Sequence, residues 1–385
     1  MNNVQWKKVK LGECCTIHGR IGFRGYTTDD LVEKGYGAIT FSPSDIHNFK
    51  LCYDDCDYIT WKKYEESPEI KVFNGDILFC KTASIGKCAY VEGLKEKATI
   101  NPQFVVLKNF QCDSKFLFYK LISYGFQTQV QGITGGSTIK TMSQEKLSLE
   151  EISVPDLPAQ RRIAAILASA DKVIAATQKT IAKYKQIKRG MMEDLLKPKD
   201  GWKMVKLGEV GDFYVGGDVD RSCFSPYPTV ECRFPIYANA LVNEGLYGFS
   251  SKYEFDKEAI TITGRGDVGK VFYRKPYFST IIRLVTLIPT DSNIYVKFLS
   301  YAMSRINFII ESTGVPQLTA PQAKKYEVSI PYKNDKPDLA EQRRIAAILS
   351  GIDAKIAAEE KVLEKYEKVK KGLMEKLLNE KCEIV

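Results

Sequence analysis

The sequence contains very little histidine and few closely spaced residues that could bind a metal. The chain of 385 residues contains two histidines, His18 and His47, both in its first half. Ten cysteines are present but form no C-x-x-C pair, and unpaired cysteines at this density are typical of a reducing compartment. Cys52 and Cys56 have the spacing of half a zinc site, but no second ligand pair completes it. We therefore expect free thiols and no metal.

Long apolar runs are also missing. No stretch of about 18 apolar residues occurs, and the opening string MNNVQWKKVKLG has no apolar signal core. We expect a cytoplasmic protein without a membrane-spanning segment. The apolar fraction of 44% is sufficient for packed cores, and the length suggests two or three domains. The net charge of +9 is compatible with a polyanionic partner such as nucleic acid.

The chain contains an internal repeat. The segment QRRIAAILASADKVIAATQKTIAKYKQIKRGMMEDLL begins at Gln160, and QRRIAAILSGIDAKIAAEEKVLEKYEKVKKGLMEKLL begins at Gln342. At an offset of 182 residues and without a gap, 21 of the 37 positions are identical. A second repeated string, WKKVKLGE at Trp6 and WKMVKLGE at Trp202, opens each half. Each half therefore consists of this start, a globular stretch and one long repeated segment.

Both long segments have the apolar 3-4 spacing of a coiled-coil helix. Pro158 and Pro198 delimit the first helix, and Asp338 with Glu341 forms a D-x-x-E capping pattern before the second. Each helix should contain about 37 residues and be ~55 Å long. The first helix is strongly cationic and the second mixes lysine with glutamate, which favours pairing within the chain.

The globular stretches mix strand and helix signals. KVFNGDILFCKTASIGKCAYV and KEAITITGRGDVGKVFYR are typical of strand–turn–strand units, whereas FLFYKLISYGFQTQV and VKFLSYAMSRINFII are typical of amphipathic helices. The regular βαβ alternation of a doubly wound sheet is missing. The predicted fold class is α+β, with two mixed α/β domains joined by two long paired helices and an internal two-fold pseudo-symmetry. We assign 1–157 and 198–338 to the domains, and 158–197 and 339–382 to the helices.

The string TGRGDVGK, residues 263–270, partly matches two nucleotide-binding loops. A P-loop needs a hydroxyl residue after its lysine, but Val271 follows Lys270. A dinucleotide fingerprint needs a following helix, but VFYRKPYF is not helical in character. The first half has the same hairpin with Gly86-Lys87 and without the other glycines. We therefore interpret this loop as a hairpin tip, which can enter a DNA groove or be an ordinary exposed turn.

No catalytic arrangement recurs in both halves. Paired acids at a reproducible spacing are missing, and the string NPQF at Asn101 lacks the third residue of the N-P-P-[FY] methyltransferase signature. Instead, TGGSTIKTMS at Thr134 and TGVPQLTA at Thr313 are a second shared feature. Small polar residues beside a lysine can contact phosphates or form a plain turn into the last strand of each domain.

The chain resembles the specificity subunits of type I restriction–modification systems over essentially its whole length. The segments LPAQRRIAAIL and LAEQRRIAAIL fit the helix start of that family, although the first has Ala159 where glutamate is usual. The W-x-x-V-x-L-G-E string and the G-D-I-L…G-x-x-G-K string of residues 75–87 are also typical of it. Singly these motifs are weak, but their combination is specific.

The resemblance implies a DNA-recognition role without catalysis. Each target recognition domain would read one half of a bipartite site in double-stranded DNA, and the antiparallel coiled coil would set the spacing. Two methyltransferase subunits carrying S-adenosylmethionine would dock around the helices. Restriction subunits using ATP and Mg²⁺ would complete the complex. Candidates for docking are Arg161, Arg162, Arg343 and Arg344, which head the two helices.

Candidates for DNA contact are polar residues in expected turns, because Arg and Lys suit phosphates and guanine edges and Asn and Gln suit adenine edges. In the first domain they are Arg20, Arg24, Lys62, Lys63, Lys81, Lys87, Gln103, Ser137 and Lys140. In the second domain they are Arg221, Arg233, Asn239, Asn243, Arg265, Lys270, Gln317 and Lys324.

Three alternatives remain open from the residues. The same domains could serve a type IIB-like or stand-alone methylation system. A coiled-coil scaffold holding two ligand-binding modules would show little affinity for duplex DNA. An enzyme that binds a nucleotide at residues 264–270 would lose binding when Lys270 is changed to alanine.

Overall fold

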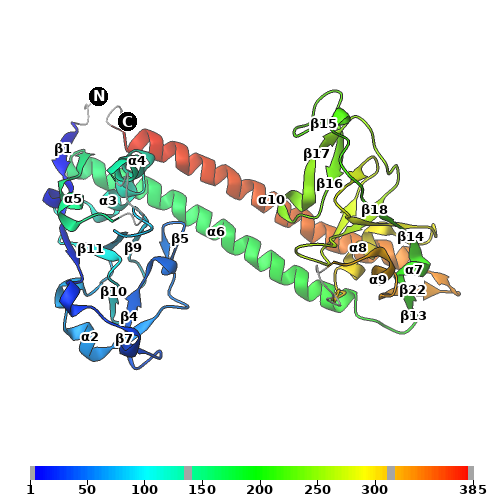
Figure 1. The fold of residues 1–385 in the computed structure, drawn as a ribbon, viewed down its shortest axis with the longest axis horizontal. Coiled ribbons are helices and arrows are strands. Elements are labelled where there is room, and N and C mark those ends of the chain that lie inside the picture. Colours follow the sequence, from blue (N-terminus) through cyan, green and yellow to red (C-terminus); the bar gives the residue numbers. More distant parts are fainter. Residues whose placement is uncertain (1–4, 134–140, 310–316, 380–385) are drawn as a thin grey trace. The chain divides into compact units, whose positions relative to one another are not determined.

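The computed structural model describes residues 5–133, 141–309 and 317–379, and its chain forms two compact units (Figure 1). The first unit comprises Met1–Gln178 with Lys361–Val385, and the second comprises Lys179–Glu360. Each unit therefore contains one globular domain together with parts of both long helices. None of the helices in the described ranges combines the length and apolar character needed to span a bilayer.

The first domain is built on two four-stranded sheets. One is fully antiparallel, in the order β2-β11-β8-β9, and the other has the order β10-β4-β7-β3 with one parallel pair, β10 and β4. The strands of these sheets are β2 (Thr16–Gly19), β11 (Phe104–Lys108), β8 (Ile77–Cys80), β9 (Cys88–Tyr90), β10 (Ala98–Ile100), β4 (Gly37–Phe41), β7 (Tyr58–Thr60) and β3 (Leu31–Val32).

The remaining elements of the first domain are short. The repeated string at Trp6 forms the edge strand β1 (Lys7–Lys10), which pairs antiparallel with the last strand of the domain, β12 (Glu151–Val154). The others are β5 (Ile46–His47), β6 (Lys50–Leu51), α1 (Leu11–Cys14), α2 (Trp61–Glu65), α3 (Ser114–Leu121), α4 (Tyr124–Ile133) and α5 (Gln144–Leu149).

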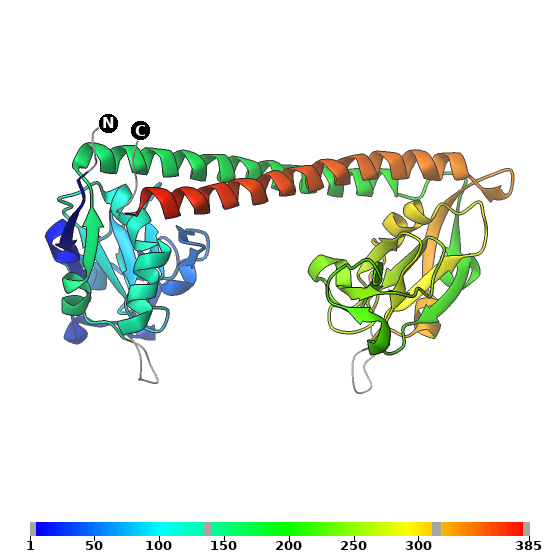
Figure 2. The same ribbon diagram turned by 90° about the horizontal axis from the view of Figure 1, so that it is seen from above.

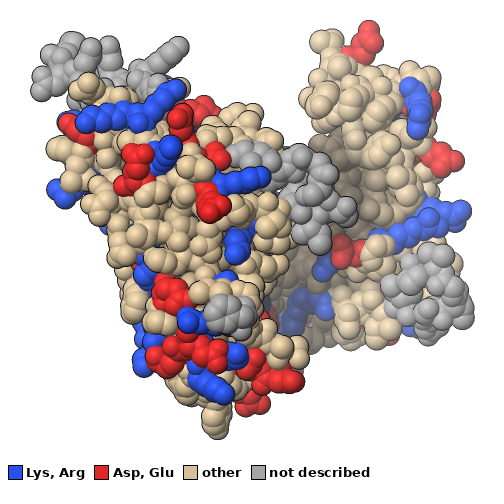
Figure 3. Space-filling model, turned by 60° about the vertical axis from the view of Figure 1, so that its left-hand side comes forward, with Lys and Arg blue, Asp and Glu red and all other residues tan. Residues whose placement is uncertain are grey.

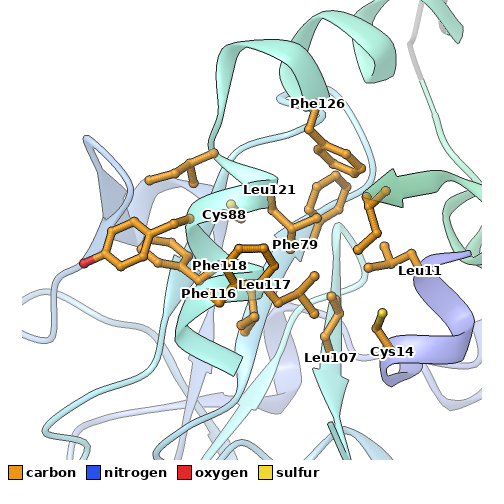
Figure 4. Packing of buried hydrophobic residues seen from close by; sticks show 14 of the residues in the cluster. Leu11, Cys14, Phe79, Cys88, Leu107, Phe116, Leu117, Phe118, Leu121 and Phe126 are labelled. Carbon is orange, nitrogen blue, oxygen red and sulfur yellow. The ribbon is translucent and has the colours of Figure 1, made fainter. Parts of the chain in front are cut away.

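The main core of the first unit lies between α3 and the antiparallel sheet. Phe116 and Leu117 of α3 are fully buried, as are Phe79 and Leu107 of the sheet, and Figure 4 shows these side chains interlocked. Asp113 caps helix α3, since its carboxylate accepts a hydrogen bond from the backbone N–H of Phe116 at 2.8 Å. The local cap and the apolar face together fix this helix on the sheet.

The second domain repeats this plan. Its antiparallel sheet has the order β14-β21-β18-β19, which matches β2-β11-β8-β9 strand for strand, and its other four-stranded sheet is β15-β17-β16-β20. The elements are β14 (Gly211–Val215), β21 (Val285–Pro289), β18 (Ala259–Ile262), β19 (Val271–Arg274), β15 (Phe224–Ser225), β17 (Leu246–Ser250), β16 (Phe234–Tyr237), β20 (Ser279–Thr280), α7 (Leu207–Val210), α8 (Val296–Met303) and α9 (Ala320–Ala323). A third sheet joins β13 (Trp202–Lys206), β22 (Glu327–Lys333) and β23 (Lys336–Pro337).

The two long helices are α6 (Leu157–Leu195) and α10 (Leu339–Leu377). The capping function predicted for Asp338 is confirmed, because its carboxylate accepts from the backbone N–H groups of Ala340 and Glu341, each at 3.1 Å. Asp156 plays the same part for α6 through the N–H of Ala159 at 3.0 Å, a cap that the sequence analysis missed. The four-part division predicted above stays a prediction, and residues 380–382 lie outside the described chain.

In each unit, the start of one long helix packs against the end of the other (Figures 1 and 2). In the first unit Ile163, Ala164 and Leu167 share a core with Leu373, Met374, Leu377 and Leu378. In the second unit Ile345, Ala346 and Leu349 share a core with Met191, Met192, Leu195 and Leu196. Every residue of one set is displaced by 182 positions from its counterpart in the other. The predicted α+β class, the antiparallel helix pairing and the internal pseudo-symmetry are thereby confirmed.

The predicted short helices are present with different bounds. FLFYKLISYGFQTQV forms two helices, α3 and α4, with a break at Ile122 and Ser123. VKFLSYAMSRINFII forms only α8, which ends at Met303, so the predicted helix is too long. The apolar side chain of Phe308 is buried without continuing the helix, since it packs against the ring of Tyr326 at a centroid distance of 4.8 Å.

Candidate nucleic-acid interface

The glycine-containing loop of the second half is a hairpin tip, as predicted. Strands β18 and β19 pair antiparallel, and residues 263–270 connect them. The backbone N–H of Gly269 donates to the carbonyl of Thr263 at 2.8 Å, and the N–H of Lys270 donates to the Thr263 hydroxyl at 2.9 Å. Gly266 and Gly269 have φ angles of +68° and +80°, which favour glycine. The tip is thus fixed by its own hydrogen bonds.

Three of the predicted DNA-contact residues meet at this tip. The guanidinium of Arg265 donates through Nε and Nη2 to Oε1 of Gln317, at 3.2 and 3.0 Å. The side-chain oxygen of Asn239 accepts from the backbone N–H of Gly264 at 2.7 Å, and its amide nitrogen donates to the carbonyl of Ile282. All three side chains are partly exposed. These bonds join the three candidates through the tip residues Gly264 and Arg265.

The matching hairpin of the first domain brings together Lys81, Lys87 and Gln103. The backbone N–H of Lys81 donates to the carbonyl of Gln103 at 2.8 Å, and the ammonium of Lys87 donates to the carbonyl of Pro43. Both lysines are half-buried, and burial lowers the pKa of Lys81 from its usual value. Ser137 and Lys140, from the adjoining string, lie outside the described residues.

Two of the predicted DNA contacts in the first domain have structural partners instead. Arg20 is 5% exposed, and its guanidinium donates to the carbonyls of Ile100 and Arg24 and to the hydroxyl of Thr99. Arg24 donates to the carbonyl of Glu66 at 3.1 Å. Arg20 connects the loop after β2 to β10, whereas Arg24 connects that loop to the end of α2. We therefore do not count Arg20 among the surface contacts, since a charged side chain so deeply buried serves the fold.

The remaining candidates lie at the surface. On α2, Lys62 is exposed and Lys63 forms an ion pair with Glu66 at 3.0 Å. In the second domain Arg221, Arg233, Asn243, Lys270 and Lys324 are exposed. Arg233 stacks on the ring of Phe234 at 5.0 Å and Lys324 lies 5.8 Å from the ring of Phe213. On the face of the first unit drawn in Figure 3, basic and acidic side chains are interspersed.

A buried arginine that no sequence motif indicated supports the second domain. Arg274 of β19 is 2% exposed, and its Nε donates to the hydroxyl of Thr261 at 2.9 Å. Its Nη2 donates to the carbonyl of Glu244 at 2.6 Å, and its guanidinium lies 3.7 Å from the ring centroid of Tyr237. A charged residue in a strand gives no sequence signal for this role. Arg274 fixes the turn at Asn243 and Glu244, both of which have positive φ angles.

The helix starts expose their arginines and bury the neighbouring glutamine. Arg161, Arg162, Arg343 and Arg344 are all exposed, so the four predicted docking residues are accessible on the described chain. Gln160 is buried, with Oε1 accepting from the N–H of Asp113 at 2.8 Å and Nε2 donating to the carbonyl of Pro155 at 2.8 Å. Gln342 repeats the first of these bonds, since its Oε1 accepts from the N–H of Tyr295 at 2.8 Å. Its Nε2 donates to the carbonyl of Asn293 at 3.0 Å and not to Pro337, the counterpart of Pro155. The shared glutamine therefore joins each domain to its own helix.

A second joint connects each domain to both helices. In the first unit the hydroxyl of Tyr119 donates to Asp171 at 2.7 Å, and Lys370 forms an ion pair with the same carboxylate at 2.6 Å. The counterparts in the second unit, displaced by 182 positions, are Tyr301, Asp353 and Lys188, with distances of 2.6 and 2.6 Å. Burial and the bonded carboxylate raise the pKa of both tyrosines. Spacing alone did not reveal these triads, because each joins three separate elements.

The repeated fold and its paired helices define a class of proteins with two similar domains and two long paired helices, and comparison with known proteins identifies the family. The family model described as "Type I restriction modification DNA specificity domain" matches residues 3–186 and again residues 199–368. The chain belongs to this family of type I specificity subunits. The resemblance inferred from the motifs is thereby confirmed.

Curated relatives and a solved structure agree with this assignment. A putative type I specificity subunit of Mycoplasma pneumoniae is 25% identical over 347 residues, which cover 82% of this chain and 93% of the relative. A second one from that organism is 28% identical over 205 residues, and the match spans 52% of this chain and about half, 54%, of that relative. The crystal structure of the S subunit from M. genitalium has the same fold, with a TM-score of 0.67 and 18% identity, covering 100% of this chain and 98% of that one.

Proposed function

We propose that this chain reads a bipartite DNA sequence for a type I restriction–modification complex and performs no chemistry itself. The observation that supports the proposal most strongly is that the two domains share one fold but differ in the side chains of their hairpin tips. The two domains share one sheet order and one set of helix joints, whereas their hairpin tips carry different side chains. Two readers on one repeated scaffold suit a target with two unlike halves.

The long helices would set the spacing of the half-sites and dock two methyltransferase subunits. The arginines at the helix starts, Arg161, Arg162, Arg343 and Arg344, are candidates for docking because all four are exposed. Arg344 also pairs with Glu341 of its own helix at 2.7 Å. S-adenosylmethionine would belong to the methyltransferase subunits, and ATP with Mg²⁺ to the restriction subunits. A reducing cytoplasm is the compartment in which such a complex would meet its DNA.

The proposal is tested by mapping methylation. The chain would be coexpressed with a methyltransferase subunit of its own system, and modified adenines would be mapped across the host genome by single-molecule sequencing. We expect a bipartite motif with a fixed gap that disappears when this chain is deleted. An assembled complex with cofactor present that leaves no motif would contradict the proposal and favour a scaffold without a DNA role.

Salt dependence separates a DNA reader from that scaffold. A protein that neutralises several phosphates loses affinity steeply between 50 and 200 mM salt, by roughly 10³-fold or more for six contacts. We expect the purified complex to show this dependence with duplex DNA. A stand-alone methylation system would give the same motif and the same salt dependence, and would differ only in the absence of cleavage when a restriction subunit is added.

A further inference from the structure

The hairpin tips of the two domains have the same backbone frame. In the first domain the N–H of Gly86 donates to the carbonyl of Cys80 at 3.1 Å, as Gly269 does to Thr263 in the second at 2.8 Å. The φ angles match as well, with Gly86 at +88° and Gly269 at +80°. The residue in the middle of each tip, Ala83 or Gly266, also has a positive φ, +62° and +68°. Residues displaced by 183 positions therefore occupy equivalent places.

A second segment lies beside each tip in the same register. The N–H of Met142 donates to the carbonyl of Lys81, and the N–H of Leu318 donates to the carbonyl of Gly264, both at 2.8 Å. These bonds place the preceding residue of the segment opposite the next residue of the tip. In the first domain the facing pair is Thr82 and Thr141, which form an isolated β-bridge. In the second domain it is Arg265 and Gln317.

The contacts of Arg265 engage one edge of its guanidinium, here called the inner edge. Its Nε and Nη2 both donate to the same oxygen of Gln317, so the inner edge of the group is engaged. The outer edge carries one N–H of Nη1 and the second N–H of Nη2, which are parallel and point along the side chain. This pair of donors matches the O6 and N7 acceptors that guanine presents in the major groove. The bond to Gln317 also restricts the side chain before any DNA binds.

We propose that Arg265, positioned by Gln317, reads one guanine in the half-site of the second domain. The inference rests on the proposed function and adds the identity of one base and of the residue that selects it. A phosphate contact is the competing role for an arginine at a tip, and it would carry no base preference. The first domain has the short hydroxyl pair Thr82 and Thr141 at this place, so its half-site has no equivalent guanine contact.

The test uses the complex of the chain with its methyltransferase subunits. Selection from randomised duplexes would first give the motif of the unchanged complex. Fluorescence anisotropy would then measure binding to duplexes in which each pair of the motif is replaced by the other three. We expect Arg265→Ala to reduce the preference for one G·C pair in one half-site by about 10- to 100-fold, with every other position unchanged.

Further variants separate reading from folding and from charge. Arg265→Lys keeps the charge but not the paired donors, and should lose most of the same preference. Gln317→Ala should weaken the preference for the same G·C pair, but by less than Arg265→Ala does. Lys275→Ala, at an exposed lysine just after β19 that is not among the predicted DNA contacts, should leave the guanine preference intact. Thr82→Ala should leave the half-site that responds to Arg265 unchanged.

The outcomes distinguish the two levels of the claim. Uniform weakening across all sequences by Arg265→Ala would overturn the guanine assignment and indicate a phosphate contact. A responding half-site without a G·C pair, or a motif that Arg265→Ala leaves unchanged, would also overturn it while leaving the proposed function intact. If the unchanged complex selects no motif at all, the proposed function fails and the assignment fails with it.

Discussion

At the scale of single residues, the buried glutamine of each helix start is the clearest structural requirement. We expect Gln160→Leu to lower the free energy of unfolding of the first unit by about 2 kcal/mol or more, because the half-buried N–H of Asp113 and the buried carbonyl of Pro155 would lose the side chain that bonds them. The shift of the urea midpoint, monitored by circular dichroism, measures this effect. Arg161→Leu is the matched control at the exposed neighbouring position, and a change there as large as that of Gln160→Leu would contradict the argument.

The tyrosines of the two triads make stability depend on alkaline pH. Burial and the bond to Asp171 or Asp353 raise the pKa of Tyr119 and Tyr301, whereas tyrosine in an unfolded chain has a pKa of about 10. Both folded phenols therefore keep their protons at a pH where the unfolded chain releases them. Their contribution to stability is complete below about pH 10 and is lost as the pH rises further.

We accordingly expect the double variant Tyr119→Phe, Tyr301→Phe to lose less stability than the unchanged chain between pH 9 and pH 11. Urea midpoints at several pH values would give the two slopes. Tyr36→Phe removes an exposed hydroxyl and serves as the control that keeps the original slope. Parallel slopes for the double variant and the unchanged chain would show that the triads do not govern the alkaline limit.

Residue types and turn positions predicted part of the candidate site. Arg265, Asn239 and Gln317 were identified individually as polar residues in turns, and the structure brings them together. Their mutual contacts were not predictable, because the backbone bond between Leu318 and Gly264 joins segments that are remote in sequence. The same limitation explains Arg20, whose partners at Thr99 and Ile100 bury it although its local sequence is typical of an exposed turn.

At the scale of elements, the apolar residues of the long helices differ in how deeply they are buried, and so in how much they should stabilise the fold. Leu167 is fully buried and Leu349, its counterpart 182 positions later, is also fully buried, whereas Ile166 is 40% exposed. We expect Leu167→Ala or Leu349→Ala to cost about 3 kcal/mol, and Ile166→Ala less than about 1 kcal/mol. For units of this size each kcal/mol lowers Tm by roughly 2–4 °C, so calorimetry can resolve the difference. Equal shifts for Leu167 and Ile166 would argue against the described packing.

The long helices and the hairpins were predictable because their signals are local and repeated. A 3-4 apolar spacing over ten turns, with a cap at one end and Pro198 beyond the other, leaves few alternatives to α6. The end of α8 was not predictable, since residues 304–309 continue the amphipathic pattern. Tertiary packing of Phe308 on Tyr326 takes the place of another helical turn there, and the sequence around Phe308 carries no sign of that partner.

At the scale of the whole molecule, the repeat gives each unit the same composite construction. Each domain is joined to the start of its own helix by a glutamine and to both helices by a tyrosine–aspartate–lysine triad. The lysine of each triad comes from the end of the other helix. Neither half of the chain therefore completes its own unit, and the two long helices are structural parts of both.

This construction predicts how the recognised sequence should respond to a longer helix. Four residues inserted after Ala175, close to the boundary between the units, would add about 6 Å to α6, which corresponds to one or two base pairs. The joints at Gln160 and Gln342 and the tyrosine–aspartate bonds lie outside the inserted stretch, so each domain stays attached to the start of its own helix. Because α10 keeps its length, α6 must shift along it by about one turn, and the lysine of at least one triad has to change its partner. We expect the gap of the methylated motif to widen by one or two base pairs while both half-sites stay the same, as read by single-molecule sequencing.

The four-residue insertion acts as a local stutter in the apolar repeat, which paired helices tolerate by unwinding slightly. Replacing Ala175 and Ala176 with glutamine keeps the helix length, so this variant is the control that should leave the gap unchanged. If the insertion altered the bases of either half-site, the helices would also affect which bases are recognised. The proposal that the helices set only the gap and the domains set only the half-sites would then be wrong.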